Sequence, residues 1–199
     1  GYTAMGVTAE NVARKYGINR EDQDAFALKS HQKAAAAIKA GRFKDEILPI
    51  KTKTQEVAED GKVTFREFVF DTDQGVRADT TLEALGKLRP AFSVSGSVTP
   101  GNSSPLNDGA SAVVLMSKEK AKSLGLAPMA TFRSFAVAGV PPELMGIGPV
   151  EAIPKALKLA GVELDQIEFI ELNEAFSSQA LYVCRTLGLN MEITNVNGG

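Results

Sequence analysis

The sequence predicts an α/β fold with a largely parallel sheet. The main observation is that strand-like apolar runs alternate with helical runs from residue 108 onward, which is the pattern of βαβ units. A second is that helical runs stop at glycines, the usual residues just past a helix end: Gly17, Gly41, Gly125, Gly161 and Gly188. A third is the composition, with 44% apolar and 23% charged residues in 199, which is typical of a globular domain.

Two helices are expected near the start of the chain. Thr8 is placed to cap a short helix over residues 8–16. Asn19 is placed to cap a longer, alanine-rich helix that runs to Ala40, and the acidic residues 21–22 in its first turn favour the positive end of the helix dipole.

The rest of the first hundred residues has a less regular pattern. Two short strands are expected over residues 46–50 and 62–70, separated by a polar segment that ends in Asp60-Gly61. Thr80 and Glu83 have the spacing of a capping box and predict a helix through Leu88, closed off by the proline at position 90. We expect this half to be an elaborated excursion and not a core of its own.

The second half is expected to supply the sheet. The predicted helices are one capped by Ser117, one ending at Ala160 with Pro154 near its start, and one over residues 174–187. The predicted strands between and around these helices cover residues 110–116, 130–140, 167–172 and 193–196.

Composition excludes several functional classes. The net charge of −2 argues against a general nucleic-acid or anionic-membrane surface, and no apolar run approaches the roughly 18 residues that span a bilayer. With one cysteine and one histidine, an internal disulfide is impossible and a Cys/His zinc cluster has too few ligands. This cysteine usage is compatible with a reducing, cytoplasmic location. The first residues lack a signal-peptide pattern and an initiator Met, and the sequence stops in a turn-like Asn-Gly-Gly, so we expect an internal fragment of a longer protein.

Three loops are candidates for chemistry. Asn173 leaves a predicted strand and opens a helix, so its side chain either caps that helix or holds a water or an oxyanion. Residues 98–109 are dense in turn formers and small polar groups, and form either a surface turn or a cradle of backbone N–H groups and hydroxyls for a ligand. Residues 145–149 are either a linker or a pocket wall.

The remaining reactive side chains have structural explanations. Cys184 shares a helical stripe with Ala180 and Leu187, which favours a buried, inert thiol over a nucleophile. His31 falls at helical spacing from apolar residues, which favours packing or partial exposure over a role as a base. The basic residues Arg77, Lys87 and Arg89 either meet phosphates or are solvated surface.

Together the loops resemble the thiolase family along nearly the whole chain. Each matching segment is weak alone, and their combination in this order is specific. The segments are residues 5–6 (MG), 8–13 (TAENVA), 23–24 (QD), 26–27 (FA), 41–47 (GRFKDEI), 87–92 (KLRPAF), 101–104 (GNSS), 108–109 (DG), 145–149 (MGIGP), 173–176 (NEAF) and 195–199 (NVNGG).

The resemblance implies a layered fold of two similar α/β halves, with a CoA-binding loop domain inserted in the first. Residues 1–104 would belong to the loop domain, residues 105–140 would finish the N-terminal half, and residues 141–199 would begin a truncated C-terminal half. The chain would thus contain the loop domain and the junction of the two halves.

The resemblance also implies acyl transfer through an acyl-cysteine intermediate. The nucleophilic cysteine would precede Gly1, and a histidine and a second cysteine would follow Gly199; Cys184 matches none of them, so the isolated chain is expected to be inactive. Asn173 matches the asparagine that positions a water in an oxyanion hole. The other matches line the substrate site: Met5, Met145, Ala175 and Phe176 lie beside the thioester, Gly101 and Ser104 touch the CoA pantetheine, and Arg77 lies near its adenine end. CoA would be a substrate, with no covalently bound cofactor and no metal.

Departures from the family pattern point to a branch. Residues 4–6 are Ala-Met-Gly where short-chain biosynthetic members often have His-Met-Gly, and residues 77–83 look more like the degradative branch. Residues 100–105 are PGNSSP where many members have AGNASG, which bears on the pantetheine contacts. The sequence therefore predicts a cytoplasmic, homo-oligomeric (dimeric or tetrameric) degradative 3-ketoacyl-CoA thiolase of fatty-acid β-oxidation, with no nucleic-acid or membrane partner. The alternatives are a biosynthetic acetyl-CoA acetyltransferase and a non-catalytic acyl-CoA- or lipid-binding thiolase-like protein.

Overall fold

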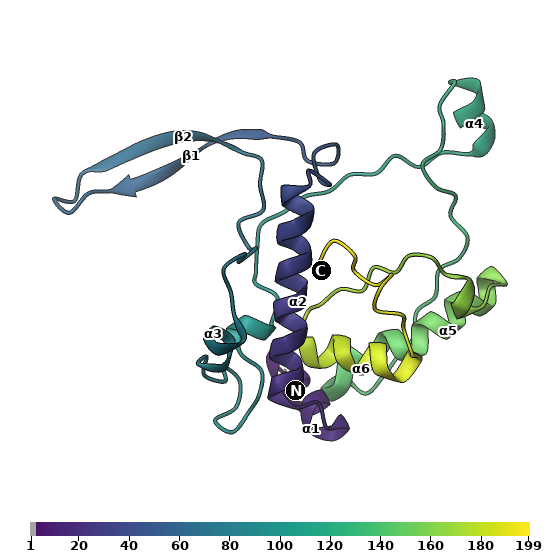
Figure 1. Cartoon of the computed structure of the whole chain (residues 1–199). Helices are drawn as coiled ribbons and strands as arrows, with labels where there is room; N and C mark the ends of the chain where they lie inside the picture. The colour runs from purple at the N-terminus through teal and green to yellow at the C-terminus, as the bar shows by residue number, and fades with distance from the viewer. Residues whose placement is uncertain (1–2) are drawn as a thin grey trace.

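The fold is built around three packed helices. The computed structural model describes residues 3–199, so the first two residues of the expected domain 1–104 lie outside it. Helices α1 (Met5–Tyr16) and α2 (Arg20–Lys39) both pack against α6 (Ser177–Leu187), near the other end of the sequence. We call these three helices the helical core, and Figure 1 shows a hairpin and a long loop reaching away from it.

The first two helices confirm the sequence pattern, with one correction. Asn19 caps α2 as predicted, because its Oδ1 accepts a hydrogen bond from the backbone N–H of Asp22 at 2.7 Å. Helix α1 begins three residues earlier than expected, and Thr8 lies inside it. The Thr8 hydroxyl donates back to the Met5 carbonyl at 2.7 Å and caps nothing.

A two-stranded antiparallel hairpin follows, formed by β1 (Ile50–Val57) and β2 (Val63–Phe70). The predicted strand over residues 46–50 is wrong, because the chain there is still turning: the N–H of Ile47 donates to the Phe43 carbonyl at 3.0 Å. The polar segment expected to separate two strands is itself β1. Its polarity suits a hairpin exposed on both faces, and the two strands are joined by a turn that contains Asp60 and Gly61.

Helix α3 (Leu82–Gly86) is shorter than predicted and starts one residue later. Its cap is Thr81, not Thr80, since Thr81 Oγ1 accepts from the N–H of Ala84 at 3.1 Å. Thr80 and Thr81 are adjacent and have the same side chain, and only Thr81 has the backbone position that lets its hydroxyl cap the helix.

The predicted parallel strands do not form. Residues 110–116 and 130–140 have no regular secondary structure, and β1 and β2 are the only strands within residues 3–199. Residues 167–172 and 193–196 meet in a single parallel bridge between Ile170 and Thr194. A strand's backbone hydrogen bonds go to neighbouring strands, and the described chain supplies none beside the first two runs.

The three predicted helices of the second half are present, two of them with shifted starts, together with two short 3₁₀ helices. They are α4 (Lys118–Ser123), capped by Ser117 as predicted, the 3₁₀ helix η2 (Pro142–Ile147), α5 (Gly148–Ala160), the 3₁₀ helix η3 (Leu164–Gln166) and α6. Because α5 begins at Gly148, Pro154 lies in its middle, which corrects the expected position near the start. Helix α6 begins at Ser177, three residues later than predicted, and ends at Gly188 in the left-handed conformation.

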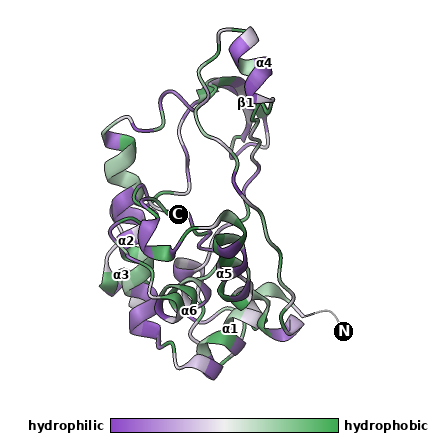
Figure 2. Cartoon of the chain, turned by 90° about the vertical axis from the view of Figure 1, so that its right-hand side faces the viewer, coloured by the Kyte–Doolittle hydropathy of each residue, from purple (hydrophilic) through white to green (hydrophobic). Residues whose placement is uncertain are grey.

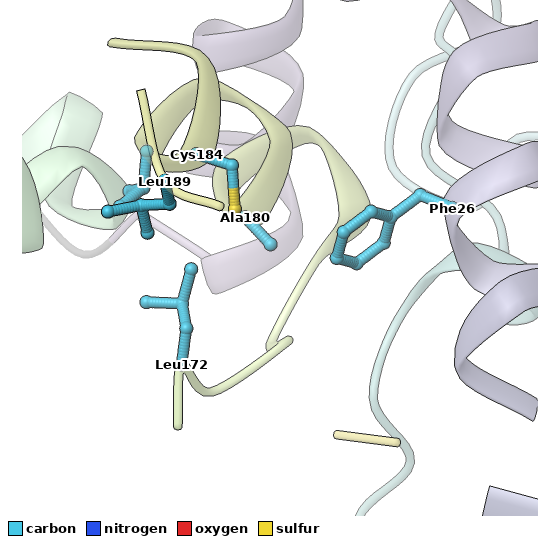
Figure 3. Packing of buried hydrophobic residues seen from close by; sticks show 6 residues of the cluster. Phe26, Leu172, Ala180, Cys184 and Leu189 are labelled. Carbon is cyan, nitrogen blue, oxygen red and sulfur yellow. The ribbon is translucent and has the colours of Figure 1, made fainter. Parts of the chain in front are cut away.

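The apolar core is small and lies beside α6. Figure 3 shows the buried cluster, in which Phe26 of α2 faces residues of α6 and of the segments flanking it. The cluster comprises Phe26, Leu172, Ala180, Val183, Cys184 and Leu189. No helix within residues 3–199 combines the length and the apolar character needed to cross a membrane.

Residues 105–140, which we call the arm, remain outside this core. Val113, Val114 and Leu115 are 83–86% exposed, and Met129 is fully exposed. In Figure 2 the hydrophobic colour accordingly continues from the helices onto thin, unpaired segments of chain.

Candidate functional site

The central feature of the candidate site is the turn formed by residues 97–104. The side chain of Asn102 accepts from the N–H of Thr99 at 2.8 Å, and Thr99 Oγ1 accepts from the N–H of Gly101 at 3.2 Å. These reciprocal bonds close the 3₁₀ helix η1 (Pro100–Asn102). A Cβ at Gly101 would overlap the methyl ends of Leu88 and Leu85, so the turn lies close against these two side chains.

This turn is joined directly to the start of α6. The N–H of Ser104 donates to the Ala175 carbonyl at 3.0 Å, and Ser103 forms an antiparallel bridge with Phe176. The structure therefore brings together two segments far apart in sequence, and with them four of the predicted site residues: Gly101, Ser104, Ala175 and Phe176.

An aromatic pair connects the start of α6 with α1. The rings of Phe92 and Phe176 meet edge to face, with centroids 6.2 Å apart. A Cβ on Gly6 would overlap the Phe92 ring, so the ring lies flat against the first turn of α1, beside Met5. Phe92 was missed as a site residue, although it ends the family-like segment 87–92.

Met5 and Met145 lie on neighbouring elements. Met145 is on η2, which is tied to α1 by a hydrogen bond of 3.0 Å from Asn11 Nδ2 to the Glu143 carbonyl. Gly146 sits against the Gln179 side chain in the first turn of α6. Both methionines are partly open to solvent, at 49% and 41% exposure, as adaptable apolar side chains at a ligand surface would be.

Asn173 does not cap α6. The residue before the helix is Phe176, whose N–H is accepted by Gln179 Oε1 at 3.4 Å. Asn173 is exposed, and its side chain makes no hydrogen bond with any residue from 3 to 199. Of the two interpretations of this side chain, capping is therefore wrong.

The backbone around Asn173 is held by a second asparagine, Asn195. Asn195 Oδ1 accepts from the N–H of Leu172, and its Nδ2 donates to the Leu172 carbonyl, both at 2.7 Å. The same Nδ2 donates to Glu174 Oε1 at 2.7 Å. Buried Asn195, with a φ of 45°, thus fixes the residues on both sides of Asn173. Sequence reasoning quoted its motif and gave Asn195 no role.

Three charged side chains set the electrostatics beside Asn173. Partial burial and then the nearby Glu174 carboxylate raise the pKa of Glu171, while Lys33 opposes the rise. Lys33 Nζ donates to the Thr194 carbonyl at 2.9 Å, which places a cation of α2 on this side of the molecule.

Arg77 lies on a recess that part of the 97–104 turn also lines, apart from the remaining predicted site residues. Arg77, Gly101 and Ser104 line one broad recess with a volume of about 3530 Å³, several times larger than a typical ligand pocket. The backbone N–H of Arg77 donates to His31 Nδ1 at 3.2 Å. Partial burial and then the Arg77 charge lower the pKa of His31 below 6.5, with Glu174 opposing. The predicted site residues Met5, Met145, Asn173, Ala175 and Phe176 do not line this recess.

Cys184 is a core residue, as the sequence pattern predicted. It is 5% exposed within the cluster of Figure 3. Burial raises the pKa of its thiol to about 11, with Glu174 adding to the rise, so the reactive thiolate is suppressed near neutral pH. Among the described residues, no group of three His, Cys, Asp or Glu side chains is arranged to hold a metal ion.

Comparison with protein families identifies two matching domains. A family model described as the thiolase N-terminal domain matches residues 2–119, and one described as the thiolase C-terminal domain matches residues 126–199. The curated relatives include a 3-ketoacyl-CoA thiolase of Bacillus subtilis (strain 168), which is 62% identical over 198 residues. That alignment covers 100% of this chain and 51% of the relative.

Solved structures agree with this match. An acetyl-CoA acetyltransferase of Bacillus anthracis superposes with a TM-score of 0.92 at 47% identity, covering 100% of this chain and 48% of its own. A human mitochondrial 3-ketoacyl-CoA thiolase in complex with CoA superposes with a TM-score of 0.89 at 43% identity, covering 99% and 47%. The predicted fold class is therefore confirmed, although the strands expected over residues 110–116 and 130–140 do not form within residues 3–199. The chain spans about half the length of the relatives it matches.

Proposed function

Because the chain belongs to the thiolase family, we propose that the protein it builds is a degradative 3-ketoacyl-CoA thiolase, an acetyl-CoA C-acyltransferase. Such an enzyme transfers the shortened acyl group of a 3-ketoacyl-CoA to a second CoA and releases acetyl-CoA, as in fatty-acid β-oxidation. Residues 4–6 and 77–83 favour this branch, as does the name of the Bacillus subtilis relative.

This chain would supply the walls of the site and not the nucleophile. In the proposal, an acyl-cysteine forms on a cysteine in the part of the relatives' length that the chain does not span, and Cys184 stays a core thiol. Asn173 would hold a water that donates to the developing oxyanion, a contribution of about 3 kcal/mol to barrier lowering. Its exposed amide, which makes no hydrogen bond with residues 3–199, and the hydrogen bonds of Asn195 to Leu172 and Glu174 support that role.

The observation that carries the proposal is the seam between residues 97–104 and the start of α6. The 3.0 Å bond from the Ser104 N–H to the Ala175 carbonyl joins the proposed pantetheine turn to the proposed acyl wall. A thioester with its pantetheine on Gly101 and Ser104 would thereby have its acyl group near Phe176. Arg77, on the recess that the turn also lines, would meet the adenine end of CoA.

Organisation and setting are part of the same proposal. Residues 1–104 would be the CoA-binding loop domain, residues 105–140 the end of the N-terminal half and residues 141–199 the start of the C-terminal half. The exposed apolar arm supports this division, because it would be covered in a complete layered sheet. We propose a homodimer or homotetramer in the cytoplasm, to be checked by light scattering and cell fractionation.

The test is CoA-dependent cleavage of acetoacetyl-CoA and of a longer 3-ketoacyl-CoA, with the protein completed to the length of its relatives and with this chain alone. We expect the completed protein to cleave both, with a higher kcat/KM for the longer substrate, and the chain alone to cleave neither. A preference for acetoacetyl-CoA would identify the biosynthetic acetyl-CoA acetyltransferase instead.

Two further outcomes would overturn parts of the proposal. Turnover by the chain alone, abolished by Cys184→Ser, would make Cys184 the nucleophile. A completed protein that binds CoA without cleaving either substrate would be the non-catalytic acyl-CoA-binding alternative.

A further inference from the structure

We propose that Glu10 and Asp24 are positioning residues that set the affinity for CoA by holding residues 97–104 in one shape. The inference rests on the function proposed above and adds two residues to it that touch no substrate. Glu10 lies on α1 and Asp24 on α2, each is 4% exposed, and neither lines the recess.

Glu10 binds the entry of the turn through backbone N–H groups. Its two carboxylate oxygens accept from the N–H of Ser97 at 3.0 Å each, and Oε1 accepts from the N–H of Val98 at 2.9 Å. Among the described residues it has no cationic partner within ion-pair distance. A buried carboxylate without a counter-ion is strongly unfavourable unless such donors reach it. Folding around Glu10 therefore requires both N–H groups to point at it, which fixes the backbone of residues 97–98.

Asp24 binds the far side of the same turn. Its Oδ1 accepts from Asn102 Nδ2 at 2.9 Å, and its Oδ2 accepts from Arg20 Nε at 2.8 Å. Asn102 Nδ2 also donates to the Ser97 carbonyl at 3.1 Å, so one amide links both ends of the turn. Arg20 in turn donates to the carbonyls of Leu85 and Leu88, whose side chains lie against Gly101.

Helix α1 joins this network to the opposite wall. Ser178 of α6 donates its hydroxyl to the Ala9 carbonyl at 3.1 Å, one residue before Glu10. Both sides of the seam are thus hydrogen-bonded to the same helix, α1. The turn is bonded to it through Glu10, and α6 through the carbonyl of Ala9. In the function proposed above, Gly101 and Ser104 contact the pantetheine, so small changes in the shape of the turn would translate directly into lost contacts.

The experiment compares Glu10→Gln and Asp24→Asn with wild type in the completed protein, measuring steady-state kinetics and CoA binding by calorimetry. Each change replaces one carboxylate oxygen by an amide NH₂ group. At that position a donor then faces the N–H donor that the carboxylate had accepted from. We expect the KM and Kd for CoA to rise about tenfold, and kcat at saturating CoA to stay within about twofold, because the reacting groups lie elsewhere.

Asp22→Asn is the matched control. Asp22 is also on α2 but partly exposed, and it pairs with Arg185 at 2.6 Å on a side away from the turn. We expect this variant to leave the KM for CoA unchanged. If all three variants lose thermal stability and none changes the KM or Kd, the two carboxylates are only structural and the inference is wrong.

A charge swap gives a second, independent readout. In Asp24→Asn with Asn102→Asp, an amide donor again faces a carboxylate acceptor, and the N–H of Thr99 keeps its acceptor at position 102. We expect the double variant to recover part of the CoA affinity lost by Asp24→Asn, though not all, because the Ser97 carbonyl loses its donor. No recovery would contradict the pairing.

Two measurements separate this inference from the proposed function. If Glu10→Gln does not fold, Glu10→Asp keeps the charge and shortens the reach, and faster amide hydrogen exchange at Ser97 and Val98 together with a raised Kd would support the inference. If wild type binds CoA without cleaving a ketoacyl-CoA, the proposed function fails while the binding test still decides the roles of Glu10 and Asp24. Wild type that binds no CoA would overturn both.

Discussion

The helical core and the arm contain similar apolar side chains, which are buried in the core and exposed to solvent in the arm. Val12 and Val183 in the core are fully buried, whereas Val113 and Val114 in the arm are 83% exposed. Both pairs lie in segments that the sequence pattern assigns to regular structure. Only the core pair belongs to elements that complete their own backbone hydrogen bonds.

This difference shows what each kind of element needs from the rest of the chain. A helix pairs its N–H and C=O groups internally and needs only caps and one apolar partner face, which Asn19, Ser117 and the packing on α6 provide. A parallel strand leaves its groups for neighbours on both sides. An apolar sequence is therefore sufficient for neither burial nor strand formation.

The largest expected effect comes from placing the same charge in the two regions. Val183→Asp buries an unpaired carboxylate in the core, and we expect it to cost at least about 4 kcal/mol and to abolish the cooperative thermal transition. Val114→Asp in the arm should change the unfolding free energy by less than about 0.5 kcal/mol. Circular dichroism melts of both variants measure this, and equal destabilisation would mean that the arm is packed in solution.

Thiol reactivity sharpens the same contrast. With a pKa of about 11 against an ordinary 9.0, Cys184 should form about a hundredfold less thiolate at pH 8 and react correspondingly more slowly with iodoacetamide. Ser111→Cys in a Cys184→Ser background places a thiol on the arm, where it should react like a free cysteine. The rate at Cys184 should rise about tenfold per pH unit toward 11, and a fast reaction at pH 8 would show that the core opens.

Glycine substitutions probe the backbone of each region. Gly198 has a φ of +83°, and a Cβ there would lie 2.8 Å from the Ser30 carbonyl oxygen and from the Ala34 Cβ of α2. We expect Gly198→Ala to destabilise the chain by about 2 kcal/mol. Gly139 in the arm has open space around it, so Gly139→Ala is the matched control and should be neutral or slightly stabilising. Denaturant melts with equal midpoints for the two variants would contradict the packing of Gly198 on α2.

The smallest effect is a pH dependence at the edge of the core. The pKa of His31 in the folded chain lies below its ordinary 6.5, so the unfolded chain binds the extra proton first as the pH falls. The contribution of neutral His31 is thus complete above pH 6.5 and is lost as the pH falls through the lowered value. His31→Gln should flatten this part of the stability profile while leaving the unfolding free energy at pH 8 nearly unchanged.

The sequence was most informative where local chemistry decides the structure. The caps at Asn19 and Ser117 and the buried position of Cys184 all follow from neighbouring residues, and all are confirmed. The family match also drew attention to residues 101–104 and 175–176, which the structure joins by a hydrogen bond, and their role in binding the substrate stays a prediction.

Prediction failed where distant residues decide. The strands over residues 110–116 and 130–140 depend on neighbours that periodicity does not reveal, and Thr81 displaced Thr80 as a cap through backbone geometry alone. Asn195 and Phe92 escaped notice because their importance lies in contacts with Leu172 and Phe176, which only the folded chain brings near. Glu10 lies in the family-like segment 8–13, but sequence reasoning gave it no role because its partners Ser97 and Val98 are far away in the sequence.

The bond between Ser104 and Ala175 has a consequence for how the chain tolerates change. It closes a large loop that contains the whole arm, and the cost of closing a loop grows only with the logarithm of its length. Doubling the number of residues in that loop would cost about 0.6 kcal/mol. Insertions and deletions in the arm of this chain are thus insulated from the geometry of the seam.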